Sequence, residues 1–316
     1  ATHRFELSPA VTFTTNAYYT YFNRDWWRQS SNSAQRPNDA SDPACAGMAN
    51  LLTTCGNEGR LRQFWTAGLE PRVAVQHGLF GVDNVAEAGV RYHFEDQFRI
   101  QANGDTPTAR DPGTGRNAGI REDSDRTVEA MSAFVQNRFD FGRWTVTPGV
   151  RFEHVDYERT DNLTGATGDS AIDEVIPGIG ATWEVLPETV VFAGVHRGFI
   201  NPAPGSDADA EESWYYEAGL RFERGAVSLE AMAFLVDYEN LLGTCTASTG
   251  GDCEIGDQYD GGKVRVHGLE FVAAWDAAAA LETDWSLPVS AVYTWTDGEF
   301  RTSFQSSFEE WGNVEE

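Results

Sequence analysis

The stretch Val85–Ile100, VAEAGVRYHFEDQFRI, alternates between two kinds of position. Val90 and Phe98 belong to an apolar series that only Asp96 interrupts, whereas the positions between them carry charged residues such as Arg91. Successive side chains of a β-strand point to opposite sides. The stretch therefore predicts a long strand with one apolar face and one charged face.

The same period of two recurs along the whole chain. The further segments that carry it are Leu61–Val75, Trp144–Phe152, Val175–Val185, Trp214–Phe222, Val227–Leu235, Leu269–Trp275 and Trp285–Trp295. Together with less regular stretches near Ala17, Thr127 and Thr189, they predict about twelve strands, most of them longer than the roughly five to six residues of ordinary sheets. No long segment shows the 3.6-residue periodicity of an amphipathic helix.

The connections between these segments alternate in length. Short turns are expected at Thr15–Asn16, Phe80–Asn84, Asp140–Arg143, Leu186–Glu188, Glu223–Gly225 and Asp276–Asp284. Long polar stretches are expected at Ser30–Gly59, Asn103–Asp123, Thr160–Asp173, Asn201–Glu212, Gly243–Gly261 and from Gly298 onward. This alternation predicts an all-β, antiparallel up-and-down meander whose long loops emerge on one side, as in a transmembrane β-barrel.

In such a barrel the apolar face contacts lipid and the charged face lines a polar interior. The residues predicted to face that interior are Glu87, Arg91, Glu95, Arg99, Arg151, Glu153, Glu217, Arg221, Glu230 and Glu270. Tryptophans near strand ends suit an interfacial belt, namely Trp26, Trp27, Trp65, Trp144, Trp183, Trp214, Trp285 and Trp295. A soluble β-sandwich or propeller with an aromatic core is the alternative interpretation.

The charge balance narrows the range of partners. The chain has 49 acidic and 23 basic residues and a net charge of -26, which disfavours binding to nucleic acid. Lys263 is the single lysine, so almost every cation is an arginine, the residue suited to bidentate binding of carboxylates. No apolar run approaches the roughly 20 residues of a transmembrane helix, which excludes a helical membrane protein.

The four cysteines form two local pairs in polar stretches. Cys45 with Cys55 and Cys245 with Cys253 are predicted to be loop-closing disulfides in an oxidising compartment. A zinc site lacks the usual C-x2-C spacing, and reduced cysteines are the remaining alternative.

Catalytic or metal-binding constellations are not visible in the sequence. The six histidines are scattered over different predicted strands and form no closely spaced ligand pair. The chain is therefore not expected to be an enzyme, and no cofactor or protein-bound metal is expected.

Several segments resemble TonB-dependent outer-membrane receptors. Strand-turn-strand units of that family are similar to Phe134–Glu153 (FVQNRFDFGRWTVTPGVRFE), Tyr216–Glu223 (YEAGLRFE) and Val264–Phe271 (VRVHGLEF), and Arg197–Pro202 (RGFINP) resembles the outer end of a strand. The likeness is greatest to the ferric-citrate and ferric-siderophore receptor branch. It includes Gly256–Val266 (GDQYDGGKVRV) and Ser303–Val314 (SFQSSFEEWGNV).

The resemblance implies an architecture. Members carry an N-terminal plug domain with a TonB box and a 22-stranded barrel, so residues 1–316 are expected to be a partial barrel domain without the plug and the C-terminal strands. The strand directions also indicate a partial barrel. A chain that starts and ends on the side of the long loops differs from bacterial barrels, whose termini are periplasmic. The charged interior residues would then contact the plug.

The resemblance also implies a function. The complete protein is expected in the outer membrane of a Gram-negative bacterium, where it takes up ferric siderophores such as ferric citrate with energy from the TonB system. Iron would arrive chelated, and outer-membrane lipid and lipopolysaccharide would surround the barrel. The alternatives are a passive porin-like channel and a soluble carbohydrate-binding protein or adhesin.

An anionic ferric chelate needs guanidinium donors at the outer rim of the barrel. By strand direction, the candidate ligand-binding residues are Arg60, Arg62, Arg99, Gln101, Arg121, Arg126 and Arg197. The alternation places Arg60, Arg62, Arg99 and Gln101 on the interior face and leaves the other three open. For any one of them, pairing with nearby acids or with lipopolysaccharide phosphates is the alternative.

Overall fold

The computed structural model describes residues 1–30, 56–106, 108–114, 118–203, 206, 208–244, 258–281 and 285–302. Cys45, Cys55, Cys245 and Cys253 lie outside the described residues, and the proposed disulfides therefore remain predictions.

A single antiparallel sheet of twelve strands makes up almost all of the described chain. Its strands, in spatial and sequence order, are β1 (Thr2–Ser8), β2 (Val11–Ser30), β3 (Gly56–Leu79), β4 (Val82–Gly104), β5 (Gly119–Asp140), β6 (Trp144–Asp161), β7 (Thr167–Leu186), β8 (Thr189–Ile200), β9 (Glu211–Arg224), β10 (Val227–Asn240), β13 (Val264–Asp276) and β14 (Pro288–Phe300). A small hairpin of β11 (Leu242–Thr244) and β12 (Gln258–Asp260) and the short helix α1 (Ala277–Ala280) complete the described elements.

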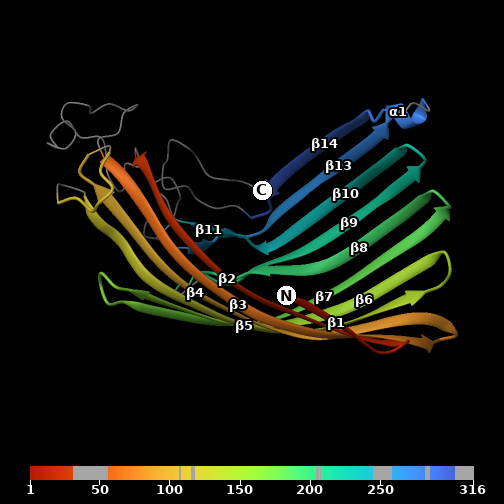
Figure 1. Cartoon of the computed structure of the whole chain (residues 1–316), viewed down its shortest axis with the longest axis horizontal. Helices are drawn as coiled ribbons and strands as arrows, with labels where there is room; N and C mark the ends of the chain where they lie inside the picture. The colour runs from red at the N-terminus through yellow and green to blue at the C-terminus, as the bar shows by residue number, and fades with distance from the viewer. Residues whose placement is uncertain are drawn as a thin grey trace.

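The sheet curves into an open trough in which every strand lies beside its neighbour in sequence (Figure 1). The turns that follow β3, β5, β7 and β9 gather at one end of the trough, which we call the inner end (Figure 1). The strand ends between β4 and β5 and between β6 and β7 lie at the opposite end, which we call the outer end. The predicted all-β up-and-down meander of about twelve strands is confirmed.

The strands differ greatly in length. β3 has 24 residues and β4 has 23, whereas β8 has 12. A tilted strand crosses the hydrocarbon core of a membrane with about 9–11 residues. The outer halves of β2 to β5 are therefore longer than a membrane crossing requires, and they form a projecting wall that β8 does not reach (Figure 1).

The first predicted turn is misplaced. A reversal is expected at Thr15–Asn16, but β2 continues through these residues and the chain reverses at Pro9 and Ala10. Proline fixes φ and cannot donate a ladder hydrogen bond, which favours a turn, whereas the β-branched threonines before Asn16 favour a strand.

The predicted long loop Thr160–Asp173 is also wrong. β6 continues to Asp161 and β7 begins at Thr167, so only a tight turn separates them. The Asp161 carboxylate accepts hydrogen bonds from the backbone N–H groups of Leu163 at 2.9 Å and Thr164 at 3.2 Å, and Gly165 adopts φ 75°. Polar residues here build a turn with local hydrogen bonds rather than an extended loop.

Burial is inverted relative to a soluble protein. On the apolar face, Val90 is 52% and Val150 is 41% exposed, and Tyr92 and Phe152 are exposed as well. On the other face, Ser132 is buried. A soluble sandwich would pack its apolar side chains together in a dry core. The exposed apolar face instead suits contact with lipid, which agrees with a β-barrel that spans a membrane.

Register joins the charged residues into one face. Arg91, Ser132, Glu153 and Glu174 lie directly opposite one another on β4 to β7. The same alternation continues across β8 to β13, where Glu217 faces Phe234 and Met232 faces Glu270. All ten residues predicted to line the interior share this face by cross-strand register, namely Glu87, Arg91, Glu95, Arg99, Arg151, Glu153, Glu217, Arg221, Glu230 and Glu270.

Many charges on the interior face have partners on the same face. The Arg221 Nε and the Glu230 Oε2 are 2.7 Å apart, and the Arg72 Nε lies 3.6 Å from Glu87. Arg151 pairs with Glu153. Arg221 with Glu230 and Arg72 with Glu87 are cross-strand pairs, whereas Arg151 and Glu153 lie on the same strand, and these contacts stabilise a charged interior surface.

Aromatic belts mark both borders of the apolar face. At the inner end, Trp144 stacks on Trp183 with ring centroids 4.8 Å apart, and toward the outer end Tyr21 lies 4.2 Å from Trp65. The belt prediction is wrong for Trp26. Register places Trp26 opposite Arg60 on the interior face.

Candidate functional site

Five arginines converge on the interior face of the projecting wall. Arg24, Arg62 and Arg99 lie directly opposite one another on β2, β3 and β4. Arg126 and Arg159 lie opposite each other on β5 and β6 and belong to the same face. We call these five residues the arginine cluster. The pairing of these long strands brings the five residues together although they are far apart in sequence.

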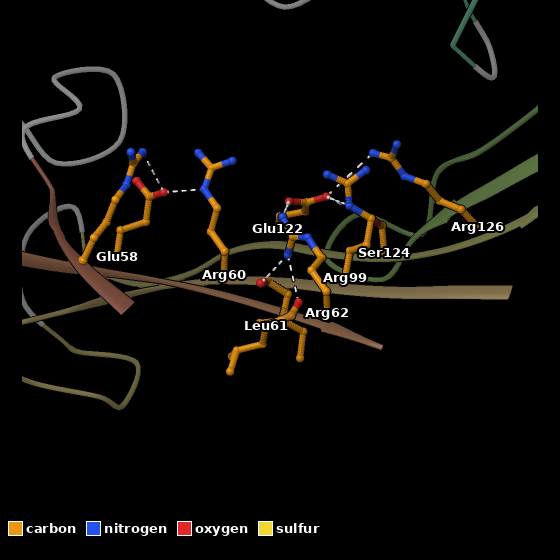
Figure 2. A network of polar contacts seen from close by, with 10 residues as sticks. Glu58, Arg60, Leu61, Arg62, Arg99, Glu122, Ser124 and Arg126 are labelled. Atoms are coloured by element: carbon orange, nitrogen blue, oxygen red, sulfur yellow. Dashed lines mark hydrogen bonds and ion pairs between the residues drawn. The ribbon is translucent and has the colours of Figure 1, made fainter. Parts of the chain in front are cut away.

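Glu122 on β5 is the carboxylate in contact with three members of the cluster. Its Oε2 lies 3.0 Å from the Arg62 Nη2, and its Oε1 lies 3.2 Å from the Arg99 Nε and 3.6 Å from the Arg126 Nη2. Figure 2 shows these guanidinium groups converging on Glu122 from three strands. One carboxylate is thus shared by several cations.

Burial makes this part of the site electrostatically unusual. Arg62 is 2% exposed, and its Nη1 donates to the carbonyl oxygens of Leu61 at 2.9 Å and Ile100 at 2.6 Å. Arg62 and Arg99 lie beyond the outer aromatic belt, in the projecting wall. Burial lowers the pKa of both guanidinium groups, Glu122 opposes this shift, and neighbouring arginines add to it.

The arginine cluster has more donors than acceptors. The buried Nε atoms of Arg24, Arg126 and Arg159 have no hydrogen-bond acceptor among the residues that the structure describes. Buried polar groups are ordinarily hydrogen-bonded, and guanidinium groups bind carboxylate and phosphate oxygens strongly. The arrangement can therefore bind an anion that offers several oxygen atoms.

A second ion-pair group lies at the outer end of β3. Glu58 is completely buried, and its Oε1 lies 2.5 Å from the Arg60 Nε and 3.2 Å from the Arg28 Nη2 (Figure 2). Arg60 is thus engaged with Glu58 rather than with Glu122. Gln101 is buried and lies opposite both Arg60 and Glu122 in the ladder.

The other two candidate residues lie apart from the arginine cluster. Arg121 is exposed at a shift in register between β4 and β5. Arg197 on β8 pairs with Glu174 at 3.1 Å and with Glu212 at 2.5 Å. The structure thus brings together Arg62, Arg99, Gln101 and Arg126, whereas Arg60 and Arg197 form ion pairs with other acids, as the alternative interpretation expects.

Sequence reasoning did not identify Arg24, Arg159 or Glu122. Arg24 and Arg159 belong to strands whose facing neighbours cannot be deduced from one sequence, because strand register depends on the whole sheet. The alternation of side chains within each strand could have placed Arg24 on the interior face. Arg24 and Trp26 alternate with Asp25 on β2, and this places both on one face.

The interior face also carries a shallow hollow of about 490 Å³ nearer the inner end. Gly149 lies opposite Gly178, and Gly180 lies opposite Gly194. At these four adjoining positions the interior face therefore carries no side chains. Arg151, His196 and Glu217 are among the lining residues. The hollow has room for a polypeptide segment that packs against the interior face.

Comparison with protein families gives one match that covers nearly the whole chain. Residues 1–313 match the model described as "TonB dependent receptor-like, beta-barrel". Among the described residues, none of the helical segments has the length and apolar character required to cross a membrane.

Curated relatives include the pesticin receptors of Yersinia pestis and Yersinia enterocolitica. The Y. pestis receptor is 28% identical over 180 residues, which cover 50% of this chain and 25% of the relative. The Y. enterocolitica receptor is 28% identical over 186 residues, with the same coverage. The match thus spans about a quarter of the length of these relatives.

Solved structures share the fold. The unliganded ferric citrate transporter FecA superposes with a TM-score of 0.72 and 19% identity, over 95% of this chain and 42% of that chain. The siderophore receptor PiuA from Acinetobacter baumannii gives a TM-score of 0.70 and 16% identity, over 94% of this chain and 46% of that chain. The ferric yersiniabactin uptake receptor FyuA from Y. pestis gives 0.60 and 19%, over 99% and 43%.

Proposed function

The chain belongs to the family of TonB-dependent receptor-like β-barrels, and from this membership we propose that the complete protein takes up ferric siderophores across the outer membrane. The family consists of transport receptors of the Gram-negative outer membrane, not of enzymes. Relatives that are named as pesticin and siderophore receptors support the proposal.

The arginine cluster carries the proposal for the ligand class. Its buried donors without acceptors suit an anionic chelate rich in carboxylate oxygens, of which ferric citrate is the simplest example. Iron is bound by the chelator, and the guanidinium groups bind the chelator's carboxylates. Because these donors line the interior face of the wall beyond the membrane, they bind the chelate before it passes through the barrel.

The interior face supports a proposal for the partners. Its ion pairs, among them Arg151 with Glu153, form a polar surface that a plug domain contacts, and the glycine-lined hollow receives one of its segments. TonB supplies the energy through that plug. Outer-membrane lipid contacts the exposed apolar face, and lipopolysaccharide surrounds the projecting wall.

Uptake of radioactive ferric citrate by cells that produce the complete protein tests the proposed function. We expect uptake that stops when TonB is deleted or when a protonophore collapses the proton gradient, because transport through a closed receptor needs energy. Cells without the protein provide the background. Uptake that continues at full rate without TonB would identify a passive channel and contradict the proposal.

A further inference from the structure

We propose that Glu122 is a built-in competitor of the ligand, which occupies the arginine cluster until an anion with several carboxylates displaces it. This inference rests on the proposed function and names the residue that determines which chelates bind. Its basis is the position of one carboxylate at the point where three guanidinium groups from three strands converge (Figure 2).

The contacts of Glu122 are those that a bound carboxylate would make. Both of its oxygen atoms are used, with Arg62 on Oε2 and with Arg99 and Arg126 on Oε1. The Ser124 hydroxyl donates a further hydrogen bond to Oε1 at 3.4 Å. A ligand carboxylate that enters the same donors brings a second negative charge to within a few ångströms, and the two repel each other. Ligand and Glu122 therefore compete for the same guanidinium groups.

The hydrogen-bond donors that have no acceptor determine which ligands can displace Glu122. Glu122 contacts Arg62, Arg99 and Arg126, whereas the buried Nε atoms of Arg24 and Arg159 lack acceptors among the described residues. A chelate with several carboxylates can replace the contacts of Glu122 and also engage these donors, with the second contact strengthened by the first. A ligand with a single carboxylate only replaces the contacts that Glu122 already makes. Its binding also costs the ligand's translational freedom, and no additional contact offsets this cost.

Charge selectivity follows from this competition. The neutral oxygen atoms of an uncharged ferric chelate form weaker hydrogen bonds with the guanidinium groups than the Glu122 carboxylate does. Such a chelate therefore does not displace Glu122. Glu122 thus excludes small monoanions and admits polycarboxylates, whereas an uncharged chelate has no charge with which to bind the guanidinium groups, whether or not Glu122 is charged. Glu122 lies at the outer end of β5, beside the register shift that follows Gln101. Its side chain can therefore move away from the arginines without breaking the backbone hydrogen bonds between β4 and β5.

The test is binding of ferric citrate to the purified complete protein, measured by titration calorimetry for the wild type and Glu122→Gln. Glutamine keeps the size of the side chain and removes its charge, so we expect about tenfold tighter binding of ferric citrate. We also expect acetate to compete with ferric citrate in Glu122→Gln and not in the wild type. An uncharged ferric trihydroxamate is the reference ligand, for which no strengthening is expected.

Glu158→Gln is the matched control. Glu158 lies on β6 at the outer part of the sheet, is exposed, and faces Thr127 on the opposite surface from Glu122. Its neutralisation changes the net charge by the same amount and should leave binding unchanged. If Glu122→Gln does not assemble, Glu122→Asp tests the same point, because its shorter side chain reaches the arginines less well and should give a smaller strengthening.

The outcomes separate this inference from the proposed function. Tighter binding by Glu122→Gln alone supports it. Weaker or unchanged binding by Glu122→Gln, while the wild type binds ferric citrate, overturns the role of Glu122 and leaves the receptor function standing. A wild-type protein that binds no anionic chelate overturns the proposed ligand class and this inference together.

Discussion

Replacing Val150 by arginine should destabilise the barrel by about 2–4 kcal/mol, because it places a charge against lipid near the middle of the membrane. Val150 is 41% exposed on the apolar face and lies opposite Val135 and Pro177. At a rise of about 3.3 Å per residue and the usual tilt, it lies roughly 15 Å above Trp144 of the inner belt. Denaturant unfolding of the complete protein in lipid vesicles measures the free energy of unfolding.

Gln136→Arg is the control for that substitution. Gln136 is at a similar height but on the interior face, where its amide donates to Glu87 at 3.2 Å. An arginine there gains an acid partner and should change the free energy of unfolding by no more than about 0.5 kcal/mol. Equal costs for the two substitutions would show that Val150 does not contact lipid.

Replacing Arg62 and Arg99 together by glutamine should weaken the binding of ferric citrate at least about a hundredfold. Each charge-assisted hydrogen bond contributes about 1.5–3 kcal/mol, and a hundredfold change corresponds to about 2.7 kcal/mol. The two residues are adjacent members of the arginine cluster, and both contact Glu122. Calorimetric titration of the purified complete protein measures the affinity.

Arg138→Gln serves as the comparison for the double variant. Arg138 lies near the inner end of β5, where it pairs with Asp140 at 3.5 Å, far along the strand from the arginine cluster. Its removal should alter the affinity less than about twofold, which is within the range of ordinary surface substitutions. A double variant that still binds ferric citrate as tightly as Arg138→Gln would exclude the arginine cluster as the ligand site.

The sequence was sufficient to predict the strands and their faces. A period of two is a local property, so the alternation in Val85–Ile100 already determines which side chains share a face of β4. The turns were harder to place. Thr15–Asn16 resembles a turn in composition but lies inside β2, because its neighbours pair with β3 along the whole length of the strand. Pairing with a neighbour outweighed local composition.

The candidate site was predictable only in part. Residue type and strand direction pointed to Arg62 and Arg99 at the outer end, and parity placed them on the interior face. The meeting of Arg24, Arg126 and Arg159 with these residues depends on register across five strands, which one sequence does not reveal. For the same reason Glu122 was not recognised as the shared carboxylate.

The most direct test of the membrane-facing surface uses fluorophores attached to single cysteines at positions 150, 151, 152 and 153 of β6. The native cysteines are replaced by serine, and the complete protein is placed in vesicles that contain brominated lipids, which quench only fluorophores in contact with acyl chains. The exposed apolar face predicts strong quenching at Val150 and Phe152 and weak quenching at Arg151 and Glu153. Strong quenching at Arg151 and Glu153, with little at Val150 and Phe152, would contradict a sheet whose apolar face contacts lipid.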